Sequence, residues 1–124
     1  GAAVDYLKKI GIESIERHEK ELTRKICNVL CEMPKIEIYG PKPEHKIGIT
    51  AFNVGDLNPH DVALALDVSA NIMVRSGHHC ALPLTKTILH RPGSVRASTY
   101  LYNTKEEIER FASAVREIAE TLAK

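Results

Sequence analysis

The stretch SVRASTYLYNTKEEIERFASAVREIAETL, residues 94–122, places a strand signal directly ahead of a helix signal. At its start, Val95 and Ala97 alternate with Arg96 and Ser98, and this two-residue period is typical of a strand with one apolar face. We therefore predict a strand over residues 94–102. Arg96 then projects from the face opposite the apolar side chains.

The second half of the same stretch predicts the closing helix. Thr104 precedes Glu107 by three residues, which is the spacing of a capping box. Apolar residues then recur at helical steps from Ile108 to Leu122. The sequence therefore predicts an amphipathic helix that begins at Thr104.

Another helix and a strand are predicted in the middle of the chain. Asn58 and Pro59 are residue types favoured at the N-cap and at the first helical position, so a helix should run from there to about Ala70. The four residues that follow it, NIMV (71–74), are predicted to form a strand.

The N-terminal part of the chain has the pattern of two helices. Apolar residues at helical steps predict a short helix over 4–10, which Gly11 ends as a flexible cap. The same pattern then predicts one long amphipathic helix over 15–33, before Pro34.

Two short strands complete the expected sheet. Isoleucines that alternate with other residues over 36–38 and 47–51 predict a hairpin around the turn GPKPEHK. Helices that alternate with short strands indicate an α+β fold in a single domain, 1–124. We expect a small mixed or antiparallel sheet of three to four short strands, with helices packed mainly on one face.

Composition limits the function classes. The chain of 124 residues is 44% hydrophobic and 27% charged, as in ordinary globular domains, and its formal net charge of +1 gives no reason to expect a nucleic acid or an anionic membrane as partner. No apolar stretch approaches the roughly 20 residues needed to span a bilayer. The chain opens without Met and already in helical pattern, so we expect it to be a piece of a longer protein.

The nine residues RSGHHCALP, which begin at Arg75, raise the question of what Cys80 does. One interpretation is a buried cysteine that packs as a small hydrophobe. The other is a reactive thiol, because Arg75, His78 and His79 favour the thiolate and Gly77 allows a sharply turned, exposed loop. We favour the reactive thiol, although no general base and orienting acid accompany it as a cysteine hydrolase requires.

A zinc site is a weaker alternative. Thiolate and imidazole are good zinc ligands, but four convergent ligands are not evident and the remaining histidines have no recognisable ligand spacing. Cys27 and Cys31 lie four residues apart on the predicted long helix, where core packing is the expected role. We therefore predict no metal. Three cysteines without a secretory signal favour reduced thiols in the cytoplasm.

Arg96 is the second candidate site residue. An arginine on the open face of a sheet is commonly a solvated residue. If another domain covers that face, its guanidinium is well suited to hold a carboxylate.

Taken together, these two motifs resemble the group II cysteine desulfurases, the SufS-like and NifS-like members of the class V aminotransferase family. The group's Arg-x-Gly-His-His-Cys-Ala-x-Pro loop is matched at Arg75, Gly77, His78, His79, Cys80, Ala81 and Pro83. Its Arg-Ala-Ser strand and Tyr-Asn-Thr turn are matched at Arg96, Ala97, Ser98, Tyr102, Asn103 and Thr104. The resemblance covers essentially the whole chain.

The resemblance implies the small C-terminal domain of a fold-type I enzyme that depends on pyridoxal 5'-phosphate. The large domain, which binds that cofactor, is absent, so this fragment alone is expected to be inactive and to hold no cofactor-binding residue. Lys86 is not in the context of the family's cofactor lysine. The complete enzyme would remove sulfur from L-cysteine, giving L-alanine.

The resemblance also implies the residue roles. Cys80 is the nucleophile that receives the sulfur as a persulfide, and Arg96 holds the substrate carboxylate. Arg75 and His79 are expected to support the site. The stretch LTKTILHRPGS departs from the family pattern, which leaves loop shape and acceptor preference open.

The expected partners are L-cysteine, a sulfur-acceptor protein for iron–sulfur cluster assembly, and a second copy of the full-length chain. Two alternatives remain: a selenocysteine lyase-like enzyme, and a persulfide carrier or protein-binding domain that works without cofactor.

Overall fold

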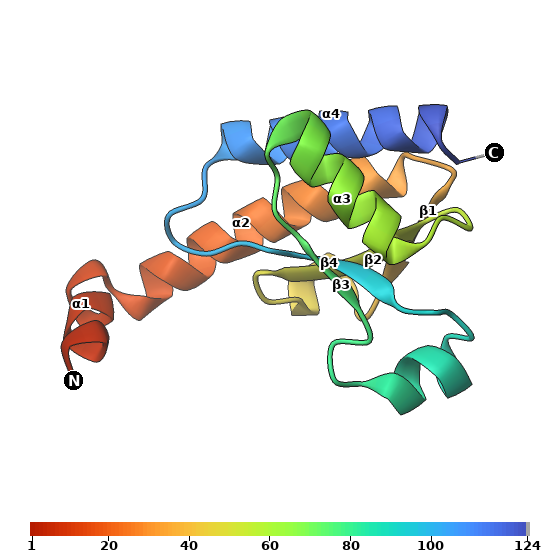
Figure 1. The fold of residues 1–124 in the computed structure, drawn as a ribbon. Helices are drawn as coiled ribbons and strands as arrows, with labels where there is room; N and C mark the ends of the chain where they lie inside the picture. Colours follow the sequence, from red (N-terminus) through yellow and green to blue (C-terminus); the bar gives the residue numbers. More distant parts are fainter. Residues whose placement is uncertain (124) are drawn as a thin grey trace.

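The computed structural model describes residues 1–123, in which a four-stranded antiparallel sheet carries helices on one face (Figure 1). In sheet order the strands are β1 (Ile36–Tyr39), β2 (Ile49–Val54), β4 (Ser94–Ser98) and β3 (Arg75–Gly77). The helices are α1 (Ala2–Ile10), α2 (Ile12–Cys31), α3 (Pro59–Ala70) and α4 (Lys105–Thr121), with short helical turns η1 (Pro43–His45) and η2 (Leu84–Ile88). The predicted α+β fold class is confirmed.

The core lies between the sheet and its helical layer. Helices α2 and α3 pack on the strands, and α4 packs against both of these helices. Phe52 of β2 is fully buried and meets Phe111 of α4 edge to face, with ring centroids 5.9 Å apart. Edge-to-face aromatic pairs are favourable, so this contact ties α4 to the sheet.

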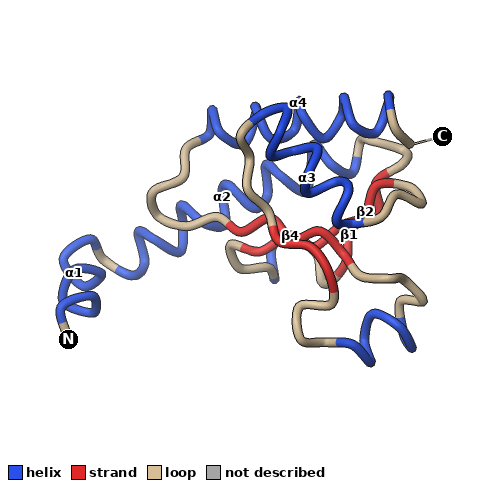
Figure 2. Tube along the Cα trace, viewed as in Figure 1, coloured by secondary structure: helices blue, strands red, loops and turns tan. Residues whose placement is uncertain are grey.

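Within residues 1–123, α2, α3 and α4 all lie on one side of the sheet, and only the short turn η2 extends from the opposite side (Figure 2). Because side chains alternate along a strand, the buried Val95 and Ala97 direct Arg96 to this uncovered face. The register pairs Arg96 with Ala51 of β2 and with Arg75 of β3, so these residues share that face. Figure 2 also shows the chain between β3 and β4 extending away from the helical layer.

Several local predictions are confirmed. The Thr104 hydroxyl accepts from the Glu107 backbone N–H, while the Glu107 carboxylate accepts from the Thr104 backbone N–H, forming the capping box. The Asn58 side chain caps α3. Gly11, with φ of 93°, separates α1 from α2, and the hairpin of β1 and β2 forms as expected.

The predicted strand over 71–74 is wrong, because the chain there forms no ladder and β3 begins at Arg75. Asn71 adopts the left-handed conformation as the C-cap of α3, and Ile72 donates to the carbonyl of Leu66. The first two residues of the segment thus form the C-terminal cap of α3 and not a strand. If the pairing of β3 with β4 continued, Val74 would lie opposite Ala97. Both residues instead line a pocket.

Two strand boundaries also differ from prediction. The strand predicted over 94–102 ends at Ser98, because the Asn103 side chain accepts from the backbone N–H of Tyr100 and closes a turn. The strand predicted over 47–51 begins at Ile49 and continues to Val54. The long helix, predicted to reach 33, ends at Cys31.

Candidate active site

Cys80 lies in an exposed turn that follows β3. Its thiol is free and its side chain is exposed, so the packing interpretation of this cysteine is wrong. The turn is closed by the backbone N–H of Ala81, which donates to the carbonyl of His78 at 2.8 Å. His79 and Cys80 have φ of 52° and 60°, which is uncommon for residues other than glycine. The surrounding contacts must therefore hold this turn.

His79 ties the turn to β4. Its Nε2 lies 3.0 Å from the carbonyl oxygen of Ser94, which can only accept, so Nε2 carries the proton. Burial lowers the pKa of the His79 imidazole, and the charges of Arg96, Arg75 and His78 lower it further, against the opposing effect of the Ser94 hydrogen bond. The ring is therefore a neutral donor that fixes the backbone beside Cys80.

Arg75 and Arg96 form a cross-strand pair beside this turn. They are opposite each other in the register of β3 and β4, and both act electrostatically on His79. Arg75 is exposed, whereas Arg96 is half-buried. Two guanidinium groups on one uncovered face provide the donors that a carboxylate requires.

Arg96 also has an unpaired donor. Its Nε is buried and has no hydrogen-bond partner among the described residues. Leaving a buried charged donor unpaired is costly, so unsatisfied groups of this kind call for an explanation. An acidic group bound against this face of the sheet would satisfy it.

A close approach of two backbones places the turn on the sheet. Gly77 ends β3 with φ of 114°, and Gly93 enters β4. A Cβ on Gly93 would lie 2.8 Å from the carbonyl oxygen of Gly77, closer than packing allows. Glycine at 93 thus lets the two ends of the Cys80 segment lie against each other.

Three contacts around the turn were not anticipated from the sequence. The Thr85 hydroxyl, buried within η2, is hydrogen-bonded at 2.8 Å to Nδ1 of His78. His60 of α3 holds the Ser76 hydroxyl at 2.8 Å through its Nδ1. Arg91 pairs with Glu37 of β1 and with Asp56, which follows β2. η2 is a π-helical turn, a rare element that is frequent at functional sites.

The other two cysteines differ from each other. Cys27 is buried and packs as expected, and burial raises the pKa of its thiol. Cys31 is exposed, so the packing prediction is wrong for this residue, which ends α2. Within residues 1–123, no three His, Cys, Asp or Glu side chains converge as metal ligands, and no helix is long and apolar enough to cross a bilayer.

Comparison with known proteins gives consistent matches. The sequence profile of the family described as aminotransferase class-V matches residues 1–111. A probable cysteine desulfurase of Methanothermobacter thermautotrophicus is 45% identical over 121 residues, which are 96% of this chain and 30% of the relative. One of Halalkalibacterium halodurans is 45% identical over 120 residues, 97% of this chain and 29% of the relative.

A solved structure shares the fold over nearly the whole chain. The apo structure of a cysteine desulfurase from Thermococcus onnurineus NA1 superposes with a TM-score of 0.91 at 43% identity, covering 98% of this chain and 30% of that one. The chain thus spans about 30% of the length of the relatives it matches.

Proposed function

Because this chain belongs to the aminotransferase class-V family, we propose that it is the C-terminal small domain, residues 1–124, of a cysteine desulfurase. The motif around Cys80 favours group II of these enzymes. The complete protein would convert L-cysteine to L-alanine and retain the sulfur. The observation that carries the proposal is the exposed free thiol of Cys80 in the turn after β3, the strand on which Arg75 lies opposite Arg96 of β4.

In the proposed reaction the Cys80 thiolate attacks the sulfur of the bound cysteine. A sulfur–sulfur bond forms as the carbon–sulfur bond of the substrate breaks, and the electron pair of the broken bond stays with carbon. Protonation of that carbon gives alanine, and the sulfur remains on Cys80 as a persulfide. The exposure of Cys80 suits later transfer of this sulfur to an acceptor protein.

We assign the substrate carboxylate to Arg96. Its buried Nε lacks an acceptor, and a carboxylate bound there would provide one. Arg75, opposite in the register, would add positive charge at the same place. His79 contributes by holding the turn through Ser94, since its Nε2–H is already engaged.

The residues of this chain fit the substrate and not the family's cofactor, pyridoxal 5'-phosphate. Its aldehyde requires a lysine, and Lys86, the lysine nearest to Cys80 in sequence, lies exposed on η2. We therefore assign no residue here to the cofactor, which the remainder of the polypeptide would bind. When bound, it supplies the electron sink that cleavage of the carbon–sulfur bond needs.

The wider assignments rest on the same family membership. We propose that the native polypeptide contains a large cofactor-binding domain, forms a homodimer, and passes sulfur to an acceptor protein for iron–sulfur cluster assembly. The three free cysteines favour a reducing compartment such as the cytoplasm.

The test is sulfur release by the complete polypeptide that contains this chain. Cys80→Ser should abolish release of sulfur from cysteine while the visible absorption of bound cofactor persists. Cys31→Ser is the matched control, because Cys31 is also exposed and free, and it should retain wild-type release. Sulfur release by Cys80→Ser at the wild-type rate would refute the nucleophile assignment. A colourless native protein as short as this chain would instead support a stand-alone carrier.

A further inference from the structure

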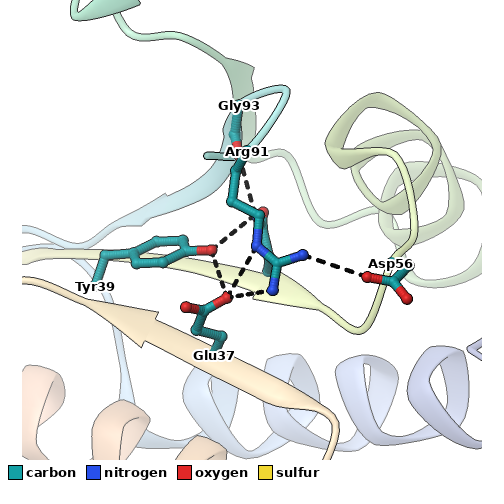
Figure 3. Close-up of polar contacts among 6 residues, drawn as sticks. Glu37, Tyr39, Asp56, Arg91 and Gly93 are labelled. Atoms are coloured by element: carbon teal, nitrogen blue, oxygen red, sulfur yellow. Dashed lines mark hydrogen bonds and ion pairs between the residues drawn. The ribbon is translucent and has the colours of Figure 1, made fainter. Parts of the chain in front are cut away.

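The segment between β3 and β4, residues 78–93, carries Cys80 near its start and is fastened to the sheet near its end by Arg91. The Arg91 Nη2 and Nε donate to the Glu37 Oε2 at 2.8 and 3.2 Å, and its Nη1 donates to the Asp56 Oδ1 at 3.3 Å (Figure 3). Glu37 belongs to β1, on the far edge of the sheet from β3. Arg91 therefore bridges the Cys80 segment to a distant strand.

The acceptor for Arg91 is itself held in place. The Tyr39 hydroxyl donates to the same Glu37 Oε2 at 2.8 Å, and the Asn53 amide Nδ2 donates to the Tyr39 hydroxyl at 3.0 Å. Asn53 is buried, and its Nδ2 also donates to the carbonyl of Gly93 at 3.0 Å. Figure 3 shows Glu37 between the Tyr39 hydroxyl and the Arg91 guanidinium, with Asp56 on the other side of Arg91. The Glu37 side of the anchor is thus tied to the buried Asn53, whereas the Asp56 side chain is fully exposed.

Hydrogen bonds continue from Arg91 to the turn of Cys80. The Arg91 backbone N–H donates to the carbonyl of Thr85 at 2.9 Å. Thr85 is 3% exposed, its hydroxyl is bonded to His78, and its N–H donates to the carbonyl of Ala81 at 3.1 Å. Residues 78 and 81 close the turn that contains Cys80. A continuous chain of contacts therefore joins the ion pairs to the turn.

The turn needs such support. His79 and Cys80 both have left-handed backbone conformations, which L side chains adopt only when their surroundings hold them. The contact of His79 with Ser94 holds one side of the turn. The η2 side, from Ala81 onward, depends on Thr85 and, through it, on Arg91.

We propose that Arg91 is a positioning residue for Cys80: its ion pairs with Glu37 and Asp56 hold residues 81–91 so that the thiol keeps one orientation. This rests on the proposed function of Cys80. Arg91 lies in the stretch LTKTILHRPGS, which joins the Cys80 turn to β4. Arg91 touches neither Cys80 nor the arginine pair in the described contacts.

The test compares Arg91→Ala, Arg91→Lys, Glu37→Gln and the double variant Arg91→Ala/Glu37→Gln in the complete polypeptide. Lys20→Ala is the matched control, since it removes an exposed ion pair with Glu16 on α2, remote from the Cys80 segment. Two readouts are used: amide hydrogen exchange of a peptide over residues 78–93, and the split between kcat and KM for cysteine at low and high salt.

For Arg91→Ala we expect exchange over 78–93 to rise and kcat to fall, each about two- to fivefold, the scale of a partly exposed ion-pair network. KM for cysteine should stay unchanged, because Arg96 lies on β4. In the double variant, Glu37→Gln should add little to the effect of Arg91→Ala on exchange and on kcat. Arg91→Lys should lose less kcat than Arg91→Ala, because it keeps the positive charge. High salt should lower the kcat of the wild type toward that of Arg91→Ala, because salt screens the ion pairs. The kcat of Arg91→Ala should not change with salt.

Unchanged exchange in Arg91→Ala would overturn the proposal, as would a rise spread evenly over the whole domain, which reports lost stability. Fully additive effects of Arg91→Ala and Glu37→Gln would also overturn it. If the wild-type protein releases no sulfur, the proposed function fails, while the exchange comparison still decides whether Arg91 holds the Cys80 turn.

Discussion

Arg75 and Arg96 lie directly opposite each other on β3 and β4, on the sheet face that the helices leave uncovered. Like charges at directly opposed positions destabilise a strand pair. Among the described residues neither arginine has an ion-pair partner. This unpaired positive charge supports the proposal that the two strands receive the carboxylate of a substrate.

Replacing Arg96 should weaken cysteine binding. If the proposed function holds, Arg96→Gln removes a charged donor to the substrate carboxylate. We then expect KM for cysteine to rise about ten- to a hundredfold in the complete polypeptide, as loss of a charge-assisted hydrogen bond predicts. Steady-state kinetics measures this. Arg24→Gln, an exposed arginine of α2, should leave KM unchanged. An unaltered KM in Arg96→Gln would refute the carboxylate role.

Replacing Arg75 should relieve repulsion in the absence of substrate. Arg75→Gln removes one of two opposed positive charges, so the free energy of unfolding should rise by about 0.2–1 kcal/mol. Denaturant unfolding of wild type and variant without ligand measures the difference. A lower free energy of unfolding in Arg75→Gln would mean that Arg75 makes a favourable contact and that repulsion from Arg96 does not dominate.

Thiol labelling should separate the three cysteines. Cys80 and Cys31 are exposed, so iodoacetamide at neutral pH should modify both. Cys27 should remain unlabelled, because it is 2% exposed and burial raises the pKa of its thiol. Peptide mass spectrometry of labelled native protein gives the sites, and labelling after denaturation provides the control. Labelling of native Cys27 would contradict its place in the core.

Stability at acid pH should depend on His79. Burial lowers its pKa in the folded state, so the unfolded state takes up the proton first as pH falls below the ordinary histidine value of about 6.5. The stabilising contribution is thus present above that pH and is lost on acidification. The Tm of His79→Gln should therefore fall less than that of wild type between pH 7.5 and pH 5.5. An equal fall of Tm in wild type and His79→Gln would contradict the lowered pKa of His79.

The capping box should contribute measurably to α4. Thr104→Ala removes the acceptor for the Glu107 N–H, and loss of such a cap typically costs about 1 kcal/mol of unfolding free energy. Thr121→Ala, at the exposed last position of the same helix, is the matched control and should cost less. Equal losses in the two variants would show that the cap is not what stabilises this helix start.

The elements that could be predicted from the sequence are those whose signals are local. Helix α4 follows from Thr104 and Glu107, and helix α3 from Asn58 and Pro59, because each cap bonds to backbone within its own first turn. The orientation of Arg96 follows from the alternation of its neighbours. The assignments of Cys80 and Arg96 to chemistry stay predictions, which the experiments above test.

The errors have two physical sources. NIMV has the composition of a strand, yet Asn71 and Ile72 end α3 through local hydrogen bonds to Asp67 and Leu66, and this cap outweighs the strand composition. The anchor of Arg91 could not be foreseen either, since Glu37 and Asp56 lie 54 and 35 residues away in the chain. Helix caps and hydrophobic periodicity act within a few residues, so they can be predicted from the sequence alone. Strand register, the opposed arginines and the support of the Cys80 turn arise only when segments far apart in sequence pack together.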